Sequence, residues 1–192
     1  ILQMVSHGLV AGGLFLMVGM IYERTHSRAV ADYGGLAKML PVFSVFFTIL
    51  TLASIGLPTT SGFTGEFMAL MGAFNAAWPQ YQAGYSLPLV LAVSLAGNDL
   101  PLILAVIAVS GVVLGALYML WLAQRILFGE ARAPHAPLTD LNSRETAILV
   151  AIVVAIFAIG LFPDDPLAKT ELAAREFQQR VAGETIQVGS TQ

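Results

Sequence analysis

The chain alternates long apolar blocks with short polar stretches. Four blocks stand out, at residues 1–22, 41–78, 101–127 and 146–162. An α-helix rises ~1.5 Å per residue, so about 20 apolar residues cross a bilayer core of ~30 Å. The first, third and fourth blocks therefore predict single membrane-spanning helices. A further apolar stretch, residues 87–96, is too short to span and is expected to lie at the interface or to re-enter the membrane.

The second block is too long for one straight helix. Its 38 residues would extend ~57 Å, and residues 58–65 combine one proline, two glycines and four hydroxyl residues between two apolar halves. Because proline and glycine interrupt helices, the block predicts a discontinuous helix broken at 58–65. The side chains and backbone expected to line the break belong to Pro58, Thr59, Thr60, Ser61, Gly62, Thr64 and Gly65.

These blocks predict an all-α, polytopic transmembrane helix bundle with one discontinuous helix. Residues 1–162 are expected to form its membrane part and residues 163–192 an extramembrane tail. The pairs Glu171/Arg175 and Glu176/Arg180 in the tail have i,i+4 spacing, which favours a short amphipathic helix. We expect this helix to rest at the membrane surface; a partner-binding helix is the alternative.

Composition agrees with a membrane protein. Charged residues make up 11% of the 192 residues, compared with ~25% in an average soluble domain. This composition excludes a nucleic-acid-binding domain and a disordered tail. The absence of cysteine excludes disulfides and thiolate metal sites, and His26 and His135 share no ligand spacing, so we expect no metal. Because Ile1 already lies in an apolar run, we expect the chain to be part of a longer protein.

Basic residues predict the orientation in the membrane. Six lie on the side of loops 23–40 and 128–144, whereas three lie in the tail. Short loops with more Lys and Arg stay in the cytoplasm, so these two loops are predicted to be cytoplasmic and the tail to lie on the opposite side. The six are Arg24, Arg28, Lys38, Arg125, Arg132 and Arg144, and the three are Lys169, Arg175 and Arg180.

Glu66 is the only charged residue between Met39 and Asn98. Counted back from Trp78 as an interfacial anchor, it lies ~18 Å deep, close to the midplane. A carboxylate there costs at least ~2.5 to 3.5 kcal/mol and indicates a functional site. We expect Glu66 in the first turn of the second half-helix, where free N–H groups favour the carboxylate while exclusion from water favours the neutral acid. The hypothesis is a proton relay; the alternative is a structural pair with a Lys or Arg of another helix.

His7 is the second candidate for proton transfer. It lies ~22 Å from the interface marked by Tyr22, and Gln3 precedes it by one helical turn. An imidazole titrating near pH ~6.5 suits a proton shuttle. The alternative is a neutral imidazole hydrogen-bonded to a neighbouring helix.

A polar stripe lies on the first half of the broken helix. Ser44, Thr48 and Thr51 recur at i, i+4 and i+7, which favours a hydrated face. The alternative is that these hydroxyls bond to carbonyls of their own helix.

Motifs spread over most of the chain together resemble one family, the antiporter-like subunits of proton-translocating NADH:quinone oxidoreductase (respiratory complex I). The most specific is Gly62-Phe63-Thr64-Gly65-Glu66-Phe67, since sister subunits usually carry lysine at the position of Glu66. The others are His7-Gly8, Tyr22-Glu23-Arg24, Gly34-Gly35-Leu36, Tyr118 and Gln124-Arg125.

The resemblance implies the last four of about fourteen membrane helices, with His7 and Glu66 in a chain of ionisable residues across the membrane. It implies a proton-translocating subunit of a bacterial inner membrane, surrounded by lipids and neighbouring antiporter-like subunits. NADH, FMN, iron–sulfur clusters and quinone are then expected on partner subunits. Alternatives are a subunit of a multisubunit cation/proton antiporter or membrane-bound hydrogenase, or a non-pumping membrane scaffold.

Overall fold

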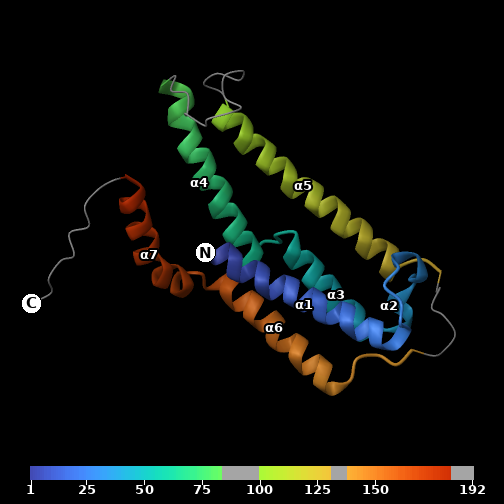
Figure 1. The fold of residues 1–192 in the computed structure, drawn as a ribbon. Helices are drawn as coiled ribbons and strands as arrows, with labels where there is room; N and C mark the ends of the chain where they lie inside the picture. Colours follow the sequence, from blue (N-terminus) through green and yellow to red (C-terminus); the bar gives the residue numbers. More distant parts are fainter. Residues whose placement is uncertain (84–99, 131–137, 183–192) are drawn as a thin grey trace, which may run out of the picture.

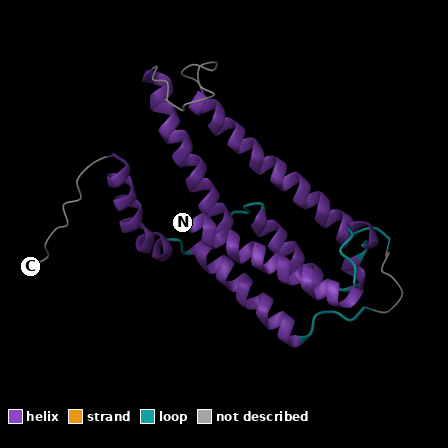
Figure 2. Ribbon diagram, viewed as in Figure 1, coloured by secondary structure: helices purple, strands orange, loops and turns teal. Residues whose placement is uncertain are grey.

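The computed structural model describes residues 1–83, 100–130 and 138–182, and all regular elements in these ranges are helical (Figures 1 and 2). The predicted segment 87–96 lies outside the described residues. The elements are α1 (Leu2–Thr25), the 3-10 turn η1 (Val30–Asp32), α2 (Leu36–Met39), α3 (Pro41–Ser54), α4 (Ser61–Ala83), α5 (Leu100–Leu127), α6 (Ser143–Leu161) and α7 (Asp164–Ala182).

Helix α1 is central and contacts α3, α4 and α6 (Figure 1). Its buried positions recur at helical spacing and form one seam, made of Leu2, Ser6, Val10, Gly13, Met17, Met20 and Ile21. Facing this seam, Leu50 of α3 and Leu149 of α6 are fully buried. A Cβ on Gly13 would lie 3.0 Å from Leu50 Cδ2, so the missing side chain lets α3 approach closely.

Three of the described helices are long and apolar enough to cross a membrane, namely Leu2–Thr25, Ile103–Leu127 and Ser143–Leu161. Helix α5 contacts α3 and α4 but leaves much of its apolar surface uncovered, since the side chains of Val106, Leu114 and Leu117 are each at least half exposed. An uncovered apolar surface of this extent needs lipid or further helices around it. The chain is an integral membrane protein with an all-α fold.

The interruption between α3 and α4 lies earlier than predicted. Residues 55–60 are not helical, whereas Ser61, Gly62, Thr64 and Gly65 already belong to α4. The expected break at 58–65 overlaps this interruption only at residues 58–60, and residues 61–65 are helical. Glu66 is the sixth residue of α4 and lies in its second turn, not in the first turn as predicted.

Gly56 explains the early end of α3. It has φ of +73°, its N–H donates to Ala53 O, and the N–H of Leu57 donates to Leu52 O at 3.1 Å. These two bonds around a left-handed glycine form a Schellman motif, which stops a helix. Pro58 follows two residues later. Because proline disfavours the helical conformation of the residue before it, a new helix cannot start at Leu57.

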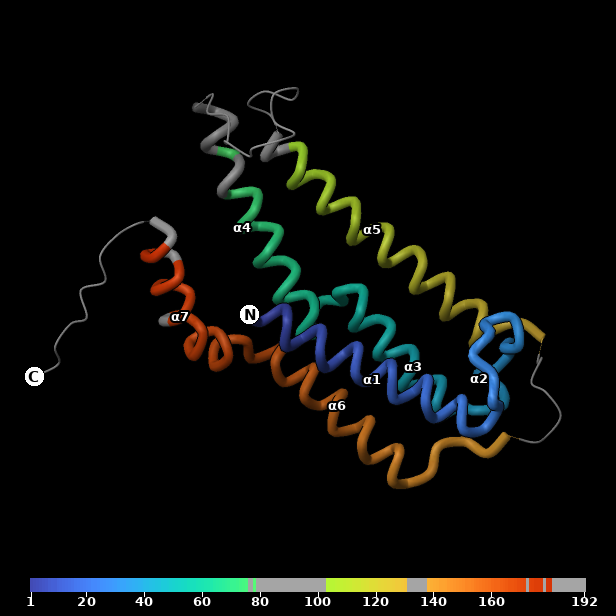
Figure 3. Tube along the Cα trace, in the orientation of Figure 1, coloured from blue at the N-terminus to red at the C-terminus, as the bar shows by residue number. Residues whose placement is uncertain are grey.

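The interruption lies beside the N-terminus of α1, as the tube in Figure 3 shows. Helix α3 has 14 residues and a length of ~21 Å, which is too short to cross the membrane alone. Whether α3 and α4 act together as one discontinuous span stays a prediction.

The loops 23–40 and 128–144 meet at one end of the bundle. Gly35 N–H donates to Phe128 O at 3.1 Å, and the carboxylate of Asp140 accepts from the N–H groups of Val42 and Phe43 at 2.8 and 3.1 Å. Asp140 thereby caps α3 from a distant part of the sequence. At the same end, Asn142 and Glu145 of the α6 N-terminus form a capping box.

Arg24 joins α1 to α6 at this end. Its guanidinium makes two bonds to the Glu145 carboxylate, at 3.0 and 2.7 Å, and also donates to the carbonyls of Thr139 and Asp140. Both side chains are mostly buried, with exposures of 15% and 14%. A bidentate pair of this kind fixes the position of α1 along α6.

Helix α7 follows α6 at the opposite end and contains the predicted tail helix. Arg175 and Glu171 form the expected i,i+4 ion pair at 2.5 Å. The division into a membrane part and a tail, and the surface-resting role of α7, stay predictions.

Candidate functional site

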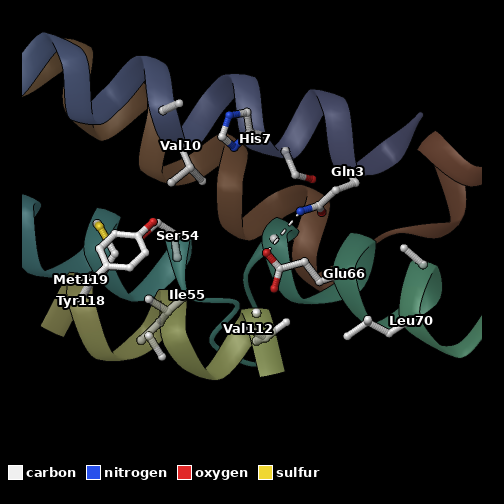
Figure 4. Close-up of a pocket in the computed structure, with 18 of the residues that line it drawn as sticks. Gln3, His7, Val10, Ser54, Ile55, Glu66, Leu70, Val112, Tyr118 and Met119 are labelled. Atoms are coloured by element: carbon white, nitrogen blue, oxygen red, sulfur yellow. Dashed lines mark hydrogen bonds between the residues drawn. The ribbon is translucent and has the colours of Figure 1, made fainter. Parts of the chain in front are cut away.

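The site forms where α4 crosses α1. Glu66 extends from α4 toward α1, and Gln3 Nε2 donates to Glu66 Oε1 at 3.3 Å (Figure 4). Among the described residues this amide is the only recorded hydrogen-bond partner of the carboxyl group. The carboxyl is therefore held by a neutral group rather than by a cation.

Small residues let the backbones approach closely at this crossing. A Cβ on Gly65 would lie 2.9 Å from Gln3 Cα, and a Cβ on Gly62 would lie 2.7 Å from Ala53 O. Both distances are shorter than real side chains allow. The two glycines of α4 thus serve close helix contact rather than unwinding, which is why α4 starts before them.

Gly56 approaches the Glu66 carboxyl from the other side. A Cβ built on Gly56 would lie 2.7 Å from Glu66 Oε2. The same glycine that ends α3 therefore also leaves room for the Glu66 side chain. The interruption before α4 therefore leaves space for the Glu66 carboxyl, although Glu66 itself lies on α4.

Helix α6 and the start of α1 hold the interruption in place. A Cβ on Gly160 would lie 2.8 Å from Ser61 N, with Thr59 O and Thr60 C closer still. Ser6 Oγ on α1 donates to Ser61 O at 3.0 Å. These contacts join three helices at the first residue of α4.

A pocket of about 520 Å³ adjoins Glu66 between α1, α3, α4 and α5. Its wall from α5 is mostly apolar and includes Val112, as Figure 4 shows. Polar side chains line the pocket from all four helices. They are Gln3, Ser6 and His7 of α1, Ser54 of α3, Glu66 of α4 and Tyr118 of α5. A pocket of this size with several polar partners can hold water.

His7 lines the same pocket one turn after Gln3 (Figure 4). Its side chain is exposed, and it makes no hydrogen bond to another of the described residues. The structure thus places the two predicted proton-carrying residues in one pocket but does not bond them directly to each other.

The predicted hydroxyl stripe does not line this pocket. Ser44 Oγ donates to Leu40 O at 2.9 Å and Thr48 Oγ1 donates to Ser44 O at 2.8 Å, as in the alternative weighed from the sequence. Thr51 Oγ1 is buried without a hydrogen-bond partner among the described residues. A hydrated face along these residues stays a prediction.

The break residues also contribute less to the pocket than predicted. Of the seven, Gly62 lines it; Thr60 Oγ1 donates to Leu57 O at 2.7 Å, and Ser61 Oγ is buried without a partner in the described part of the chain. Thr59 has φ of +85°. Their role as a lining for transported protons stays a prediction.

Sequence reasoning missed the direct partner of Glu66. Gln3 was visible only as a polar residue one turn before His7, and its contact with Glu66 depends on the packing of α1 on α4. Gly160 carried no sequence signal, because nothing in α6 indicates what its glycine faces. In the described residues no group of three or more His, Cys, Asp or Glu side chains could hold a metal ion.

Comparison with known proteins agrees with this fold. Residues 1–87 match the family described as NADH:quinone oxidoreductase/Mrp antiporter, TM. NADH-quinone oxidoreductase subunit M of Rhodobacter capsulatus is 38% identical over 165 residues, which is 85% of this chain and 27% of that protein. NADH-ubiquinone oxidoreductase chain 4 of Marchantia polymorpha is 40% identical over 166 residues, 85% of this chain and 28% of that protein.

The chain is also similar to a solved structure. A chain of respiratory complex I from Thermus thermophilus with bound NADH matches with a TM-score of 0.66 and 31% identity, covering 84% of this chain and 29% of that chain. The chain therefore spans less than a third of the relatives it matches. Fold and site define a helical membrane protein with an ionisable group between its helices. More narrowly, residues 1–87 match the family of NADH:quinone oxidoreductase and Mrp antiporter transmembrane subunits, and most of the chain is similar to subunit M, or chain 4.

Proposed function

We propose that the chain forms part of a proton-translocation channel in the membrane arm of an NADH:quinone oxidoreductase. Glu66 accepts and releases the proton, and His7 passes it through the pocket that both residues line. The energy comes from quinone reduction in other subunits. The chain acts as a proton-pumping subunit without a redox site of its own.

The observation that carries this proposal is the environment of the Glu66 carboxyl. It lies between apolar helices, its hydrogen bond comes from the neutral Gln3 amide, and the described lining of the pocket contains no Lys or Arg. A carboxyl paired with a fixed cation would stay ionised, whereas one held by an amide can take up and lose a proton. His7 in the same pocket supplies a second group that can carry a proton near neutral pH.

The surroundings of the chain follow from the same proposal. Its partners are other membrane subunits, especially neighbouring antiporter-like ones, together with lipids, and partner subunits hold NADH, FMN, iron–sulfur clusters and quinone. Loops 23–40 and 128–144 lie in the cytoplasm and the tail on the other side. Hydrogen bonds that join these two loops support placing them on one side of the membrane.

A second candidate function is a subunit of a multisubunit cation/proton antiporter, since the matching family is named for both kinds of protein. The two relatives described above, which match most of this chain, are an NADH-quinone and an NADH-ubiquinone oxidoreductase subunit, which favours the first proposal. Purification of the tagged full-length protein distinguishes the two. We expect it to bring down NADH-oxidising subunits, and their absence from an intact, stable complex would favour the antiporter.

The direct test is Glu66→Gln in the assembled complex, reconstituted into vesicles with a pH-sensitive dye. Gln keeps the shape and the hydrogen bond to Gln3 but carries no exchangeable carboxyl proton. We expect proton translocation through this chain to be lost, so that the complex still assembles but translocates fewer protons per NADH. Glu23→Gln, at the exposed end of α1, is the matched control and should pump normally. Full pumping by Glu66→Gln would refute the proposal.

A further inference from the structure

The two polar atoms of the Gln3 amide differ in their hydrogen bonding. Its Nε2 donates to Glu66 at 3.3 Å, while its Oε1 is buried and has no hydrogen-bond donor among the described residues. A buried polar atom without a partner costs about 1–3 kcal/mol in a folded protein and calls for an explanation. The polar group that the amide contacts in this structure is the Glu66 carboxyl.

Gln3 packs closely on Gly65 of α4. A Cβ at residue 65 would lie closest to Gln3 Oε1, then 2.9 Å from Gln3 Cα and 3.1 Å from Gln3 Cβ, so Gln3 has no room to move further toward Gly65. The side chain can still rotate about its last bond, which exchanges the positions of Nε2 and Oε1 with little change of shape. The contact therefore has two possible hydrogen-bond directions.

We propose that Gln3 is a positioning residue whose carboxamide hydrogen-bonds Glu66 in both of its protonation states and reverses direction as the proton arrives and leaves. With Glu66 ionised, Gln3 N–H donates to the carboxylate. With Glu66 protonated, the amide rotates about its last bond and the carboxyl O–H donates to Gln3 Oε1. The amide keeps both of its own hydrogens throughout, so the transported proton moves only between Glu66 and the pocket.

The inference rests on the proposed function of Glu66 and explains why its neighbour is an amide. A lysine or arginine at residue 3 could only donate, and so would favour the ionised carboxyl, whereas a carboxylate could only accept. An amide can do either and leaves both states of Glu66 accessible. The other titratable side chains that line the pocket in the described part of the chain are His7 on α1 and Tyr118 on α5, and neither bonds to Glu66.

The test compares infrared spectra and proton translocation in the intact complex. Gln3→Met keeps the length and unbranched shape but removes both hydrogen-bonding groups, and Gln3→Asn keeps the amide on a shorter stem. Met4→Leu is the matched control, because Met4 is the next residue of α1 and its side chain is 76% exposed. Difference spectra between acid and alkaline buffer report the carboxyl band of protonated Glu66, identified by its loss in Glu66→Gln.

We expect the Glu66 band to move to higher wavenumber in both Gln3 variants, as a carboxylic acid band does when a hydrogen bond is lost. Translocation should fall at least about threefold in both, given the usual net strength of one hydrogen bond. Met4→Leu should match the parent in both measurements. An unchanged band or an unchanged rate in both Gln3 variants would overturn this inference, while Glu66→Gln still decides the proposed function independently.

Discussion

Gly160→Ala tests whether α6 holds the interruption between α3 and α4. The new Cβ would lie closest to Thr59 O, and even Ser61 N, the most distant of its three nearest atoms, would be 2.8 Å away, whereas ordinary contacts begin at 3.4 Å. The nearby atoms are backbone atoms of residues 59–61, which cannot rotate aside as a side chain can. Overpacking of this kind costs about 1–3 kcal/mol.

Gly111→Ala is the matched control, since a Cβ on this α5 glycine would meet nothing within 4 Å. Both substitutions gain up to ~1 kcal/mol in helix propensity, so the difference between them isolates the steric effect. We expect Gly160→Ala to have an unfolding free energy ~1–3 kcal/mol below that of Gly111→Ala. Denaturant titration of the purified, fluorescently tagged protein in detergent measures it. Equal stability of the two variants would refute the reasoning.

Three further predictions concern the contacts around this site and at the loop end, each measured by the same titration. Asp140→Ala should lower the unfolding free energy by about 0.5–2 kcal/mol because α3 loses its cap, whereas Asp140→Asn should retain most of it; equal losses would contradict a capping role. Arg24→Met and Glu145→Gln should show a coupling energy of about 0.5–3 kcal/mol in a double-mutant cycle, and strict additivity would mean that the pair does not join α1 to α6. Gly56→Ala should cost at least about 1–2 kcal/mol because φ is +73°, and both Gly56→Ala and Gly56→Asn bring a Cβ 2.7 Å from Glu66 Oε2, so asparagine should relieve only the backbone part of the cost; an alanine variant of full stability would exclude the left-handed turn.

Much of the helical pattern could be predicted from the sequence. Long apolar runs have one stable arrangement in lipid, so α1, α5 and α6 begin and end within a few residues of the predicted blocks. The two ends of the interruption between α3 and α4 were harder to predict, because a sequence does not distinguish the roles of Gly56, Gly62 and Gly65. Only packing shows that Gly56 ends a helix, while the other two let α4 approach α3 and α1.

The site could be predicted only in part, for a related reason. Glu66 and His7 stand out because ionisable groups are rare in apolar helices, and the structure places both at one pocket. Gln3 and Gly160 gain their meaning from residues more than 60 positions away, Glu66 and the turn before α4 respectively. Local sequence patterns do not carry such contacts.

The central claim is that protons pass through Glu66. The most direct measurement is the number of protons translocated per NADH oxidised by the complex in sealed vesicles, compared between the parent and Glu66→Gln. The account predicts that Glu66→Gln assembles and still carries the Gln3 contact but translocates fewer protons per NADH. An unchanged ratio at an unchanged rate of NADH oxidation would contradict it.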